Sequence, residues 1–388
     1  TEGAALGHKM SDATCTAPKT CSVCGATEGS ALGHSYSAVV TAPTCGADGY
    51  TTHTCVTCGD SYTDNTVPAT GEHTATISYV NGANVITCSA CGKTFSVTAA
   101  QFKINGAYLT LASDISVIYR VTVPAGFENA YVVFDVNGVK YTATSFGKDA
   151  NGRDLFSYPG INPQMMGDNI CATVYATVDG MEVSYTHANY SVLQYCNRQF
   201  ELGAADKLKV LISDLLVYGA ASQKQVGYKT DALVTDLFNY ELKASTFPGV
   251  GNINNQQAVP GDKTANDVVS AGLNLSNQVV LKFGFQFTDT DRSKYTIKIT
   301  IGDKVCTYNA AECYAEGSRY YLNFSDYSAS QFDDTVTVCV MEGDTVVSRT
   351  LTYSINSYIA KNAGADTDFA RLLQATYNYG VSAKNYVA

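Results

Sequence analysis

The sequence predicts a mainly β protein with α additions (α+β), in which cysteine-rich repeats precede two duplicated β modules. Three observations predict this class. The pattern Cys-x-x-Cys-Gly occurs three times before residue 93. Apolar residues alternate with a period of two in two related stretches, which is typical of half-buried strands. Each stretch is followed by a segment with the 3.6-residue periodicity of an amphipathic helix.

Length and composition narrow the class of protein. A chain of 388 residues is long enough for two or three domains. The net charge of −10 disfavours nucleic acid as a partner, because phosphate binding needs a surplus of lysine and arginine. The longest apolar run, Leu208 to Ser222, contains Lys209 and Asp214 and is too short for a bilayer span. We therefore expect no membrane insertion within this chain, and the low charged fraction of 15% favours a secreted, extracellular protein.

The N-terminal region concentrates residues that bind metals. Eight of the 13 cysteines and four of the five histidines precede residue 92. Structural zinc takes four ligands, and each Cys-x-x-Cys-Gly turn supplies two thiolates. We expect zinc-ribbon-like units holding structural Zn²⁺, with one site at His8, Cys15, Cys21 and Cys24, a second at His34, Cys45, Cys55 and Cys58, and an incomplete third at His73, Cys88 and Cys91.

Two alternatives remain open for these units. Each histidine could instead close the unit that precedes it, and the eight cysteines, an even number in a secreted region, could form disulfides. Units this short cannot bury a core, so cross-links of some kind are needed. A metal site with four protein ligands has no open position for water, so its role would be structural.

The second half of the architecture is a duplication. The stretches Leu109–Val123 and Leu273–Phe287 keep one apolar phase and predict strands. Strand hairpins follow in both copies, and in the first copy Asn137-Gly138 forms a favoured two-residue turn. Both copies therefore indicate Ig-like antiparallel β-sandwiches.

Each copy ends in a pair of helices. Short helices are expected near 192–200 and 355–362, and each precedes a longer one. The longer helices carry matching apolar stripes that include Tyr218 in the first copy and Tyr379 in the second. Asp206 and Thr367 are the expected N-terminal caps.

These patterns define the expected domains. They are repeat 1 (1–33), repeat 2 (34–72), a degenerate repeat 3 (73–98), sandwich A (99–199), the helical segment of module A (200–244), a linker (245–267), sandwich B (268–354) and the helical segment of module B (355–388).

The rest of the chain offers little for catalysis. Neither GxSxG nor HExxH occurs, and no nucleophile, base and orienting group can be assembled from motifs, so we expect no enzyme activity. Cys306 and Cys313 could bridge a hairpin or be buried thiols. The 27 tyrosines, in a chain without tryptophan, indicate contact surfaces for proteins or sugars.

Two kinds of stretch resemble a known class of protein. "ATCTAPKTCSVCGATEGSALGH" and "PTCGADGYTTHTCVTCGDSYTDNTVPATGEH" resemble the tandem cysteine-knuckle repeats of large surface proteins of anaerobic, gut-type clostridia. "LLVYGAASQKQVGYKTDALV" is similar to the helical end of a module that recurs in such proteins. The resemblance implies a secreted or wall-attached, non-catalytic protein, and some proteins of this class engage host glycoproteins, including immunoglobulins.

The sequence therefore predicts an adhesin-like surface protein whose partner is a host protein or glycoprotein. One alternative is a structural protomer of a surface filament or layer, which binds copies of itself through edge strands. A polysaccharide-binding accessory protein or an enzyme is the third interpretation.

Overall fold

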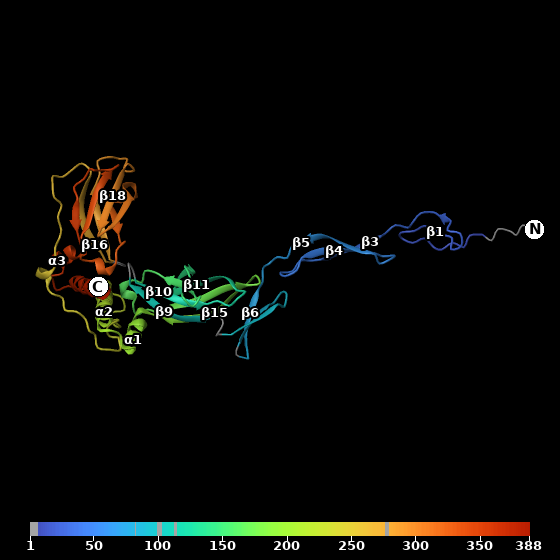
Figure 1. Ribbon diagram of the computed structural model, residues 1–388, viewed down its shortest axis with the longest axis horizontal. Helices are drawn as coiled ribbons and strands as arrows, with labels where there is room; N and C mark the ends of the chain where they lie inside the picture. The colour runs from blue at the N-terminus through green and yellow to red at the C-terminus, as the bar shows by residue number, and fades with distance from the viewer. Residues whose placement is uncertain (1–6, 82, 99–102, 112–114, 276–278) are drawn as a thin grey trace, which may run out of the picture. The chain divides into compact units, whose positions relative to one another are not determined.

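The chain forms two compact units. The computed structural model describes residues 7–81, 83–98, 103–111, 115–275 and 279–388, apart from the side chains of residues 111 and 185–187. The first unit comprises Thr1–Phe102, Pro124–Asn129 and Tyr175–Tyr185, and the second comprises Lys103–Val123, Ala130–Val174 and Thr186–Ala388. The described residues are mainly β with four α-helices, which confirms the predicted fold class (Figure 1). The expected start of sandwich A, residues 99–102, lies outside the described residues.

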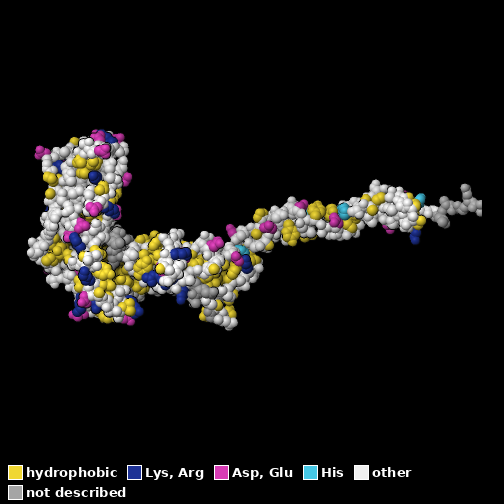
Figure 2. All heavy atoms as spheres, in the orientation of Figure 1, with side chains coloured by type: hydrophobic (Ala, Val, Ile, Leu, Met, Phe, Trp, Pro, Cys, Tyr) yellow, Lys and Arg dark blue, Asp and Glu magenta, His cyan; other side chains and the backbone are white. Residues whose placement is uncertain are grey.

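Three small antiparallel sheets make up the N-terminal region, in the order β1-β2, β3-β4-β5 and β6-β7-β8. Their strands are β1 (Lys19–Thr20), β2 (Thr27–Glu28), β3 (Tyr36–Thr41), β4 (Gly49–Cys55), β5 (Ser61–Val67), β6 (Ala75–Val80), β7 (Ala83–Cys88) and β8 (Thr94–Thr98). Every residue of β3 and β5 is exposed, and Figure 2 shows hydrophobic side chains on the surface of this region. A sheet without a covered face has no apolar core to stabilise it, so these ribbons depend on other links.

Module A is a sandwich of two sheets with strand orders β13-β10-β9 and β12-β11-β14-β15. Its strands are β9 (Lys103–Leu111), β10 (Ile115–Thr122), β11 (Glu128–Val136), β12 (Val139–Thr144), β13 (Asp154–Tyr158), β14 (Ile170–Val178) and β15 (Met181–Tyr190). The two sheets meet where the ring of Tyr119 packs 5.3 Å from that of Phe134, and where the Tyr119 hydroxyl donates to the Ile170 carbonyl. The predicted hairpin at Asn137-Gly138 is confirmed, because Val136 pairs with Val139 and both turn residues have positive φ.

Module B repeats this architecture, with strand orders β16-β17-β21-β20 and β19-β18-β22-β23, and β24 also pairs with β22. Its strands are β16 (Asp267–Asn274), β17 (Val280–Gln286), β18 (Tyr295–Ile301), β19 (Lys304–Asn309), β20 (Tyr314–Glu316), β21 (Arg319–Phe324), β22 (Val336–Glu342), β23 (Thr345–Val346) and β24 (Leu351–Tyr353).

Each of the two alternating stretches in the sequence is two strands rather than one. Within Leu109–Val123, β9 ends at Leu111 and β10 begins at Ile115, and the two strands pair in antiparallel register. The corresponding stretch of module B contains the end of β16 and all of β17. The apolar phase is the same in both strands of each pair, so alternation alone did not reveal where one strand ends and the next begins.

Each module ends in a short helix followed by a long one. They are α1 (Val192–Glu201) and α2 (Asp206–Val226) in module A, and α3 (Ile355–Asn362) and α4 (Asp368–Val387) in module B. The helices α2 and α4 pack together, and the buried rings of Tyr218 and Tyr379 stack with centroids 5.6 Å apart and an interplanar angle of 7°. Gly219 and Gly380, which follow these tyrosines, allow close packing, because a Cβ there would lie 2.8 Å from Met166 Sδ and 2.7 Å from Phe332 Cδ2.

The predicted caps are correct at one helix only. The Thr367 side chain accepts a hydrogen bond from the Ala370 amide, as expected of an N-cap. In module A the N-cap is Ala205, which makes no side-chain cap, and Asp206 is the first helical residue. Asp206 lies instead in the first turn, where a negative charge is favourable toward the helix dipole.

The segment between the modules, residues 245–267, is tied to its surroundings at several points. Ser245 donates to the buried Asp214 carboxylate of α2 through its amide and its hydroxyl, each at 2.7 Å. Further along, the Ala258 amide and carbonyl both pair with Thr352 of β24. These bonds tie the start of the expected linker to α2 of module A and its middle to β24 of module B.

Candidate metal centres

The three Cys-x-x-Cys-Gly turns have one local structure. In each, the amide of the first cysteine donates to the carbonyl five residues later, and the glycine amide donates back to the first cysteine. The turn at Cys55 shows the pattern, with Gly59 N to Cys55 O at 2.9 Å and Cys55 N to Asp60 O at 2.7 Å. The glycine has positive φ in all three turns, at Gly25, Gly59 and Gly92. This conformation favours glycine, which is why it ends the motif.

A histidine is held beside each turn in the same way. The residue after the first cysteine donates its amide to the carbonyl of the residue after the histidine, as in Val56 N to Ser35 O at 3.0 Å. Equivalent bonds join Ser22 to Lys9 and Ser89 to Thr74. Each histidine then presents Nδ1 to the thiols, with Cys58 Sγ 3.4 Å from His34 Nδ1.

The structure groups the eleven candidate ligands into three clusters, and within each cluster all ligand atoms lie within 4.8 Å of one another. The clusters are Cys15, His34, Cys55 and Cys58; then Cys45, His73, Cys88 and Cys91; and finally His8, Cys21 and Cys24.

This grouping corrects the one expected from the sequence. Cys15 does not join His8, Cys21 and Cys24, and Cys45 does not join the cluster of His34. Each of these two cysteines instead completes the cluster of the next repeat, so the third repeat, which we expected to be incomplete, has four ligands. The alternative frame, with each histidine closing the unit before it, does not describe these clusters either.

The physical reason is a turn that carries the cysteine away from its own repeat. In the Thr-Cys-x-Ala turns at residues 14–17 and 44–47, the threonine amide donates to the alanine carbonyl, at 2.8 and 2.9 Å. The first turn is also bonded to the segment before His34, through Leu32 N to Thr14 O and Gly33 N to Cys15 O. The second is bonded through Thr70 N to Thr44 O. The turn therefore belongs structurally to the repeat that follows.

The dimensions of the two four-ligand clusters fit a tetrahedral metal ion. Zinc–sulfur bonds of about 2.3 Å imply sulfur–sulfur edges of about 3.8 Å in a tetrahedron. The Sγ atoms of Cys15 and Cys55 are 3.8 Å apart, and those of Cys45 and Cys88 are 3.7 Å apart. Because these separations are far longer than the roughly 2.05 Å of a disulfide, and all thirteen cysteines are free thiols, the arrangement suits a metal ion better than disulfides.

The electrostatics of the turns favour thiolate ligands. Backbone hydrogen bonds from Thr57 and Cys58 lower the pKa of Cys55 to about 5. The same kind of hydrogen bonds lowers the pKa of Cys21 to about 6, and that of Cys88 to about 6. Burial, with the neighbouring thiols, raises the pKa of Cys15 to about 11. A bound cation would favour the thiolate of Cys15 as well, since metal coordination deprotonates thiols.

The clusters could hold a metal ion, and their chemistry is structural. Three thiolates and one imidazole are a donor set typical of structural zinc, and four protein ligands leave no position for water. Such a site can link two ribbons that have no core of their own. One packing contact supports the third ribbon as well, since Cys45, Cys88 and Met181 are buried together, with Ala75 and Phe95 packed against them.

Among the described side chains, His53 and the five cysteines after residue 100 lie outside these clusters. The His53 ring stacks on Tyr62, with centroids 4.7 Å apart, and its Nε2 lies 2.9 Å from Asp64 Oδ1, so it is a strand residue and no fifth ligand. Cys306 and Cys313 are both free, and Cys306 Sγ lies 3.6 Å from Asp326. Burial raises the pKa of Cys313 to about 11.

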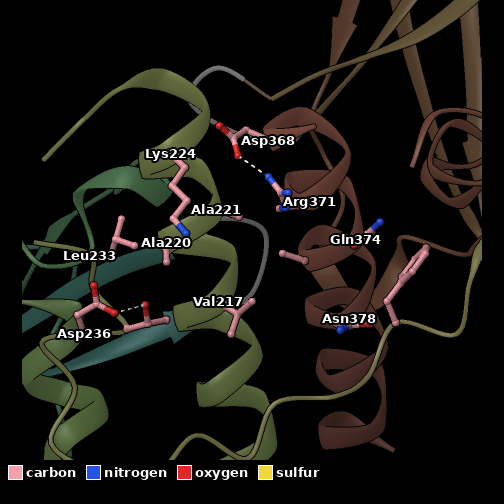
Figure 3. Close-up of a pocket in the computed structure, with 13 residues that line it drawn as sticks. Val217, Ala220, Ala221, Lys224, Leu233, Asp236, Asp368, Arg371, Gln374 and Asn378 are labelled. Atoms are coloured by element: carbon pink, nitrogen blue, oxygen red, sulfur yellow. Dashed lines mark hydrogen bonds and ion pairs between the residues drawn. The ribbon is translucent and has the colours of Figure 1, made fainter. Parts of the chain in front are cut away.

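A cavity of about 360 Å³ opens between α2 and α4 (Figure 3). Its charged lining residues are Lys224, Asp236, Asp368 and Arg371, and Arg371 pairs with Asp368 at 2.9 Å. The described residues that line it include no cysteine, histidine or serine. The cavity is therefore a weaker candidate for chemistry than the metal clusters.

Comparison with known proteins adds little to this description. No protein-family model matches the chain, and no curated protein matches it. One solved structure, described as "Ca2+-stabilized adhesin helps an Antarctic bacterium reach out and bind ice", is 14% identical and aligns over 84% of this chain with a TM-score of 0.20. This chain spans 66% of that structure, just under two thirds. The likeness to a bacterial adhesin is weak, and a TM-score this low carries no argument about function. No helix in the described part of the chain is long and apolar enough to cross a membrane.

Proposed function

We propose that this chain is a non-catalytic, extracellular bacterial surface protein of the adhesin type. The N-terminal ribbons, held by structural Zn²⁺, act as a spacer, and the duplicated sandwich modules bind a host glycoprotein. The observation that carries the proposal is the pair of closed four-ligand clusters between successive coreless ribbons, because such clusters can hold a segment in shape and cannot activate a substrate. Binding must then reside in the modules.

Module B offers the best contact surface. Tyr314, Tyr321, Lys282 and Asn323 lie together on the outer face of the sheet formed by β17, β21 and β20, and we call them the Tyr314 patch. The Tyr314 and Tyr321 rings are 6.0 Å apart, and Lys282 Nζ lies 4.2 Å from the Tyr321 ring centroid. The Tyr314 hydroxyl donates to Asn323 Oδ1 at 3.2 Å. Aromatic rings beside polar groups can stack on the apolar face of a sugar while hydrogen bonding its hydroxyls.

The duplication shows that the fold does not require this patch. Strand pairing places Leu155 of module A where module B has Tyr321, and Ile118 where module B has Lys282. Ile118 is buried, whereas the Lys282 side chain is 28% exposed. The strand β20, which carries Tyr314, is replaced in module A by residues 146–148, which bond to β13 without forming a strand. Residues that differ between copies and are open in only one copy are candidates for binding.

The test is retention of the full chain on immobilised mucosal glycoproteins, before and after enzymatic removal of their glycans. We expect the wild-type chain to bind the glycosylated form, and the variant Tyr314→Ala/Tyr321→Ala to bind at least about tenfold more weakly, since aromatic residues often dominate an interface. Tyr386→Ala is the matched control, because Tyr386 is 46% exposed on α4, away from the patch.

Three results would count against the proposal. Equal binding by the wild type and the double variant would exclude the Tyr314 patch. Binding that survives glycan removal would exclude a sugar ligand. A wild-type chain that binds only copies of itself, seen as filaments by electron microscopy, would favour the structural protomer instead.

A further inference from the structure

The first cluster differs from the other two in having three ligands. Cys24 Sγ lies 3.3 Å from His8 Nδ1, and Cys21 is buried beside them. Within residues 7–81 and the other described ranges, no fourth His, Cys, Asp or Glu joins this group. In the complete clusters, the fourth ligand is the cysteine of a Thr-Cys-x-Ala turn, Cys15 or Cys45.

The described backbone beside the first cluster matches that beside the two complete clusters. The Ser22 amide donates to the Lys9 carbonyl at 3.0 Å, as the equivalent bonds do in the other two repeats. Gly7, just before His8, has φ of 63°, compared with 71° for Gly33 and 69° for Gly71. The Gly33 amide donates a hydrogen bond to the Cys15 carbonyl of a Thr-Cys-x-Ala turn. Gly7 therefore has the backbone conformation of the glycine that accepts such a turn.

We propose that the first cluster is a docking site for the Thr-Cys-x-Ala turn of a further repeat unit. The turn's thiolate is the fourth ligand of a metal ion held by His8, Cys21 and Cys24, and its cysteine carbonyl accepts a hydrogen bond from the Gly7 amide. Each repeat unit thus supplies the cysteine that completes the metal site of the next unit.

The two complete clusters indicate which repeat unit can supply the fourth cysteine ligand. Cys15 and Cys45 are each buried in a complete cluster of this chain, with 5% and 6% exposure. A second copy of the described residues therefore has no such cysteine to spare. The cysteine must come from a repeat unit whose own Thr-Cys-x-Ala turn is not already bound to a cluster. A small thiol is a poor substitute, because it lacks the carbonyls that accept hydrogen bonds from backbone amides in the complete clusters.

The test uses the full chain and a capped peptide of residues 12–19, whose sequence is DATCTAPK. The chain is first loaded with two equivalents of Zn²⁺, and a third equivalent is added as Co²⁺, whose absorption reports the number of thiolate ligands. Peptide binding is followed by fluorescence anisotropy of a labelled peptide, and by the intensity of the sulfur-to-cobalt band.

We expect one peptide to bind per chain, only with the third metal equivalent, together with stronger sulfur-to-cobalt absorption. Affinity should be at least about tenfold higher than for 2-mercaptoethanol, which has no carbonyl, because the peptide adds backbone hydrogen bonds to the thiolate ligand. A peptide with Cys15→Ser should not bind, and neither should the chain variant Cys21→Ser/Cys24→Ser.

Equal binding of the peptide and 2-mercaptoethanol would overturn the docking proposal, as would peptide binding to the Cys21→Ser/Cys24→Ser chain. A cobalt spectrum that the peptide leaves unchanged would also overturn it. Since the assay does not depend on glycan binding by the modules, its failure would leave the proposed adhesin function to its own test.

Discussion

A single cysteine decides which ribbons are joined. We expect Cys45→Ser to remove about one zinc ion per chain, because it leaves His73, Cys88 and Cys91 with three ligands. The change should disturb the ribbon of β6, β7 and β8 rather than that of β3, β4 and β5. Metal analysis and NMR signals of the His73 and His34 rings provide the measurement.

The control is Cys306→Ser, which alters a free cysteine outside the clusters. It should leave the zinc content and both histidine signals unchanged. If Cys45→Ser shifted His34 and spared His73, the clusters would follow the repeat-by-repeat grouping, and the arrangement described above would be wrong.

Gly180, in the turn between β14 and β15, is fixed by its surroundings as well as by its conformation. Its φ is 73°, and a Cβ there would lie 2.8 Å from the Gly71 carbonyl oxygen and 3.0 Å from His73 Cδ2. We expect Gly180→Ala to lower the free energy of unfolding by about 2–4 kcal/mol, from backbone strain plus overpacking. Chemical denaturation provides the measurement.

Gly152→Ala is the matched control for this substitution. Gly152 also has positive φ, 75°, but a Cβ there would meet nothing within 4 Å. It should cost only the backbone strain, about 1–2 kcal/mol. Equal costs for the two variants would show that the contact with Gly71 contributes nothing.

At the residue scale, the sequence identified all eleven members of the clusters and missed their grouping. Residue type and the Cys-x-x-Cys-Gly spacing make each candidate ligand recognisable. The six-residue step from Cys15 to Cys21, however, reaches up to about 20 Å when extended, so nearness in sequence did not imply a shared site. The one usable signal was that Cys15 and Cys45 lie outside the Cys-x-x-Cys-Gly motifs, which marks these two cysteines as different from the other six before residue 92.

At the element scale, α2 and α4 carry the contact between the two modules. Tyr218 and Tyr379 are both buried and stack on each other. We expect Tyr218→Ala to destabilise the second unit by about 3–5 kcal/mol, the usual cost of deleting a buried aromatic ring. Tyr218→Phe keeps the ring and should cost much less. Thermal or chemical unfolding of each variant provides the measurement.

A double-mutant cycle separates the stack from general burial. With Tyr379→Ala as the second change, we expect a coupling of about 0.5–1.5 kcal/mol, typical of aromatic pairs. A coupling near zero would contradict a direct contribution from the stacked rings.

The elements could be predicted where local chemistry determines them. The Asn137-Gly138 turn, the short helices α1 and α3 and the Thr367 cap all follow from local preferences. The apolar pattern runs unbroken from β9 into β10, so periodicity could not separate the two strands. The close fit at Gly219 and Gly380 depends on Met166 and Phe332, which are distant in sequence, and no local pattern could reveal it.

At the scale of the whole molecule, metal removal should act on one part of the chain. We expect a chelator, added under reducing conditions, to abolish amide protection within residues 7–98, because the described ribbons there have exposed strands and no large core. Residues 130–174 and 186–388 should keep theirs, since they bury two sandwich cores and four helices. Hydrogen exchange by mass spectrometry provides the measurement.

Readdition of Zn²⁺ should restore the protection, and Ca²⁺ should not, because thiolate ligands disfavour a hard cation. Ribbons that stay protected after complete metal removal would contradict a structural role for the clusters. Loss of protection throughout residues 186–388 would show that the modules depend on the metal as well.

The grouping of the ligands also has a mechanical consequence. One cluster closes the chain from Cys15 to Cys58, and the next closes it from Cys45 to Cys91, so residues 45–58 belong to both closed loops. With metal bound, a stretching force applied to the two ends of residues 15–91 acts on the metal–thiolate bonds. Most of the chain inside each closed loop is then not under tension. Rupture of one cluster would release its hidden length while the neighbouring cluster still held. Overlapping loops of this kind would let the region lengthen in steps under a sudden load, without opening both loops at once.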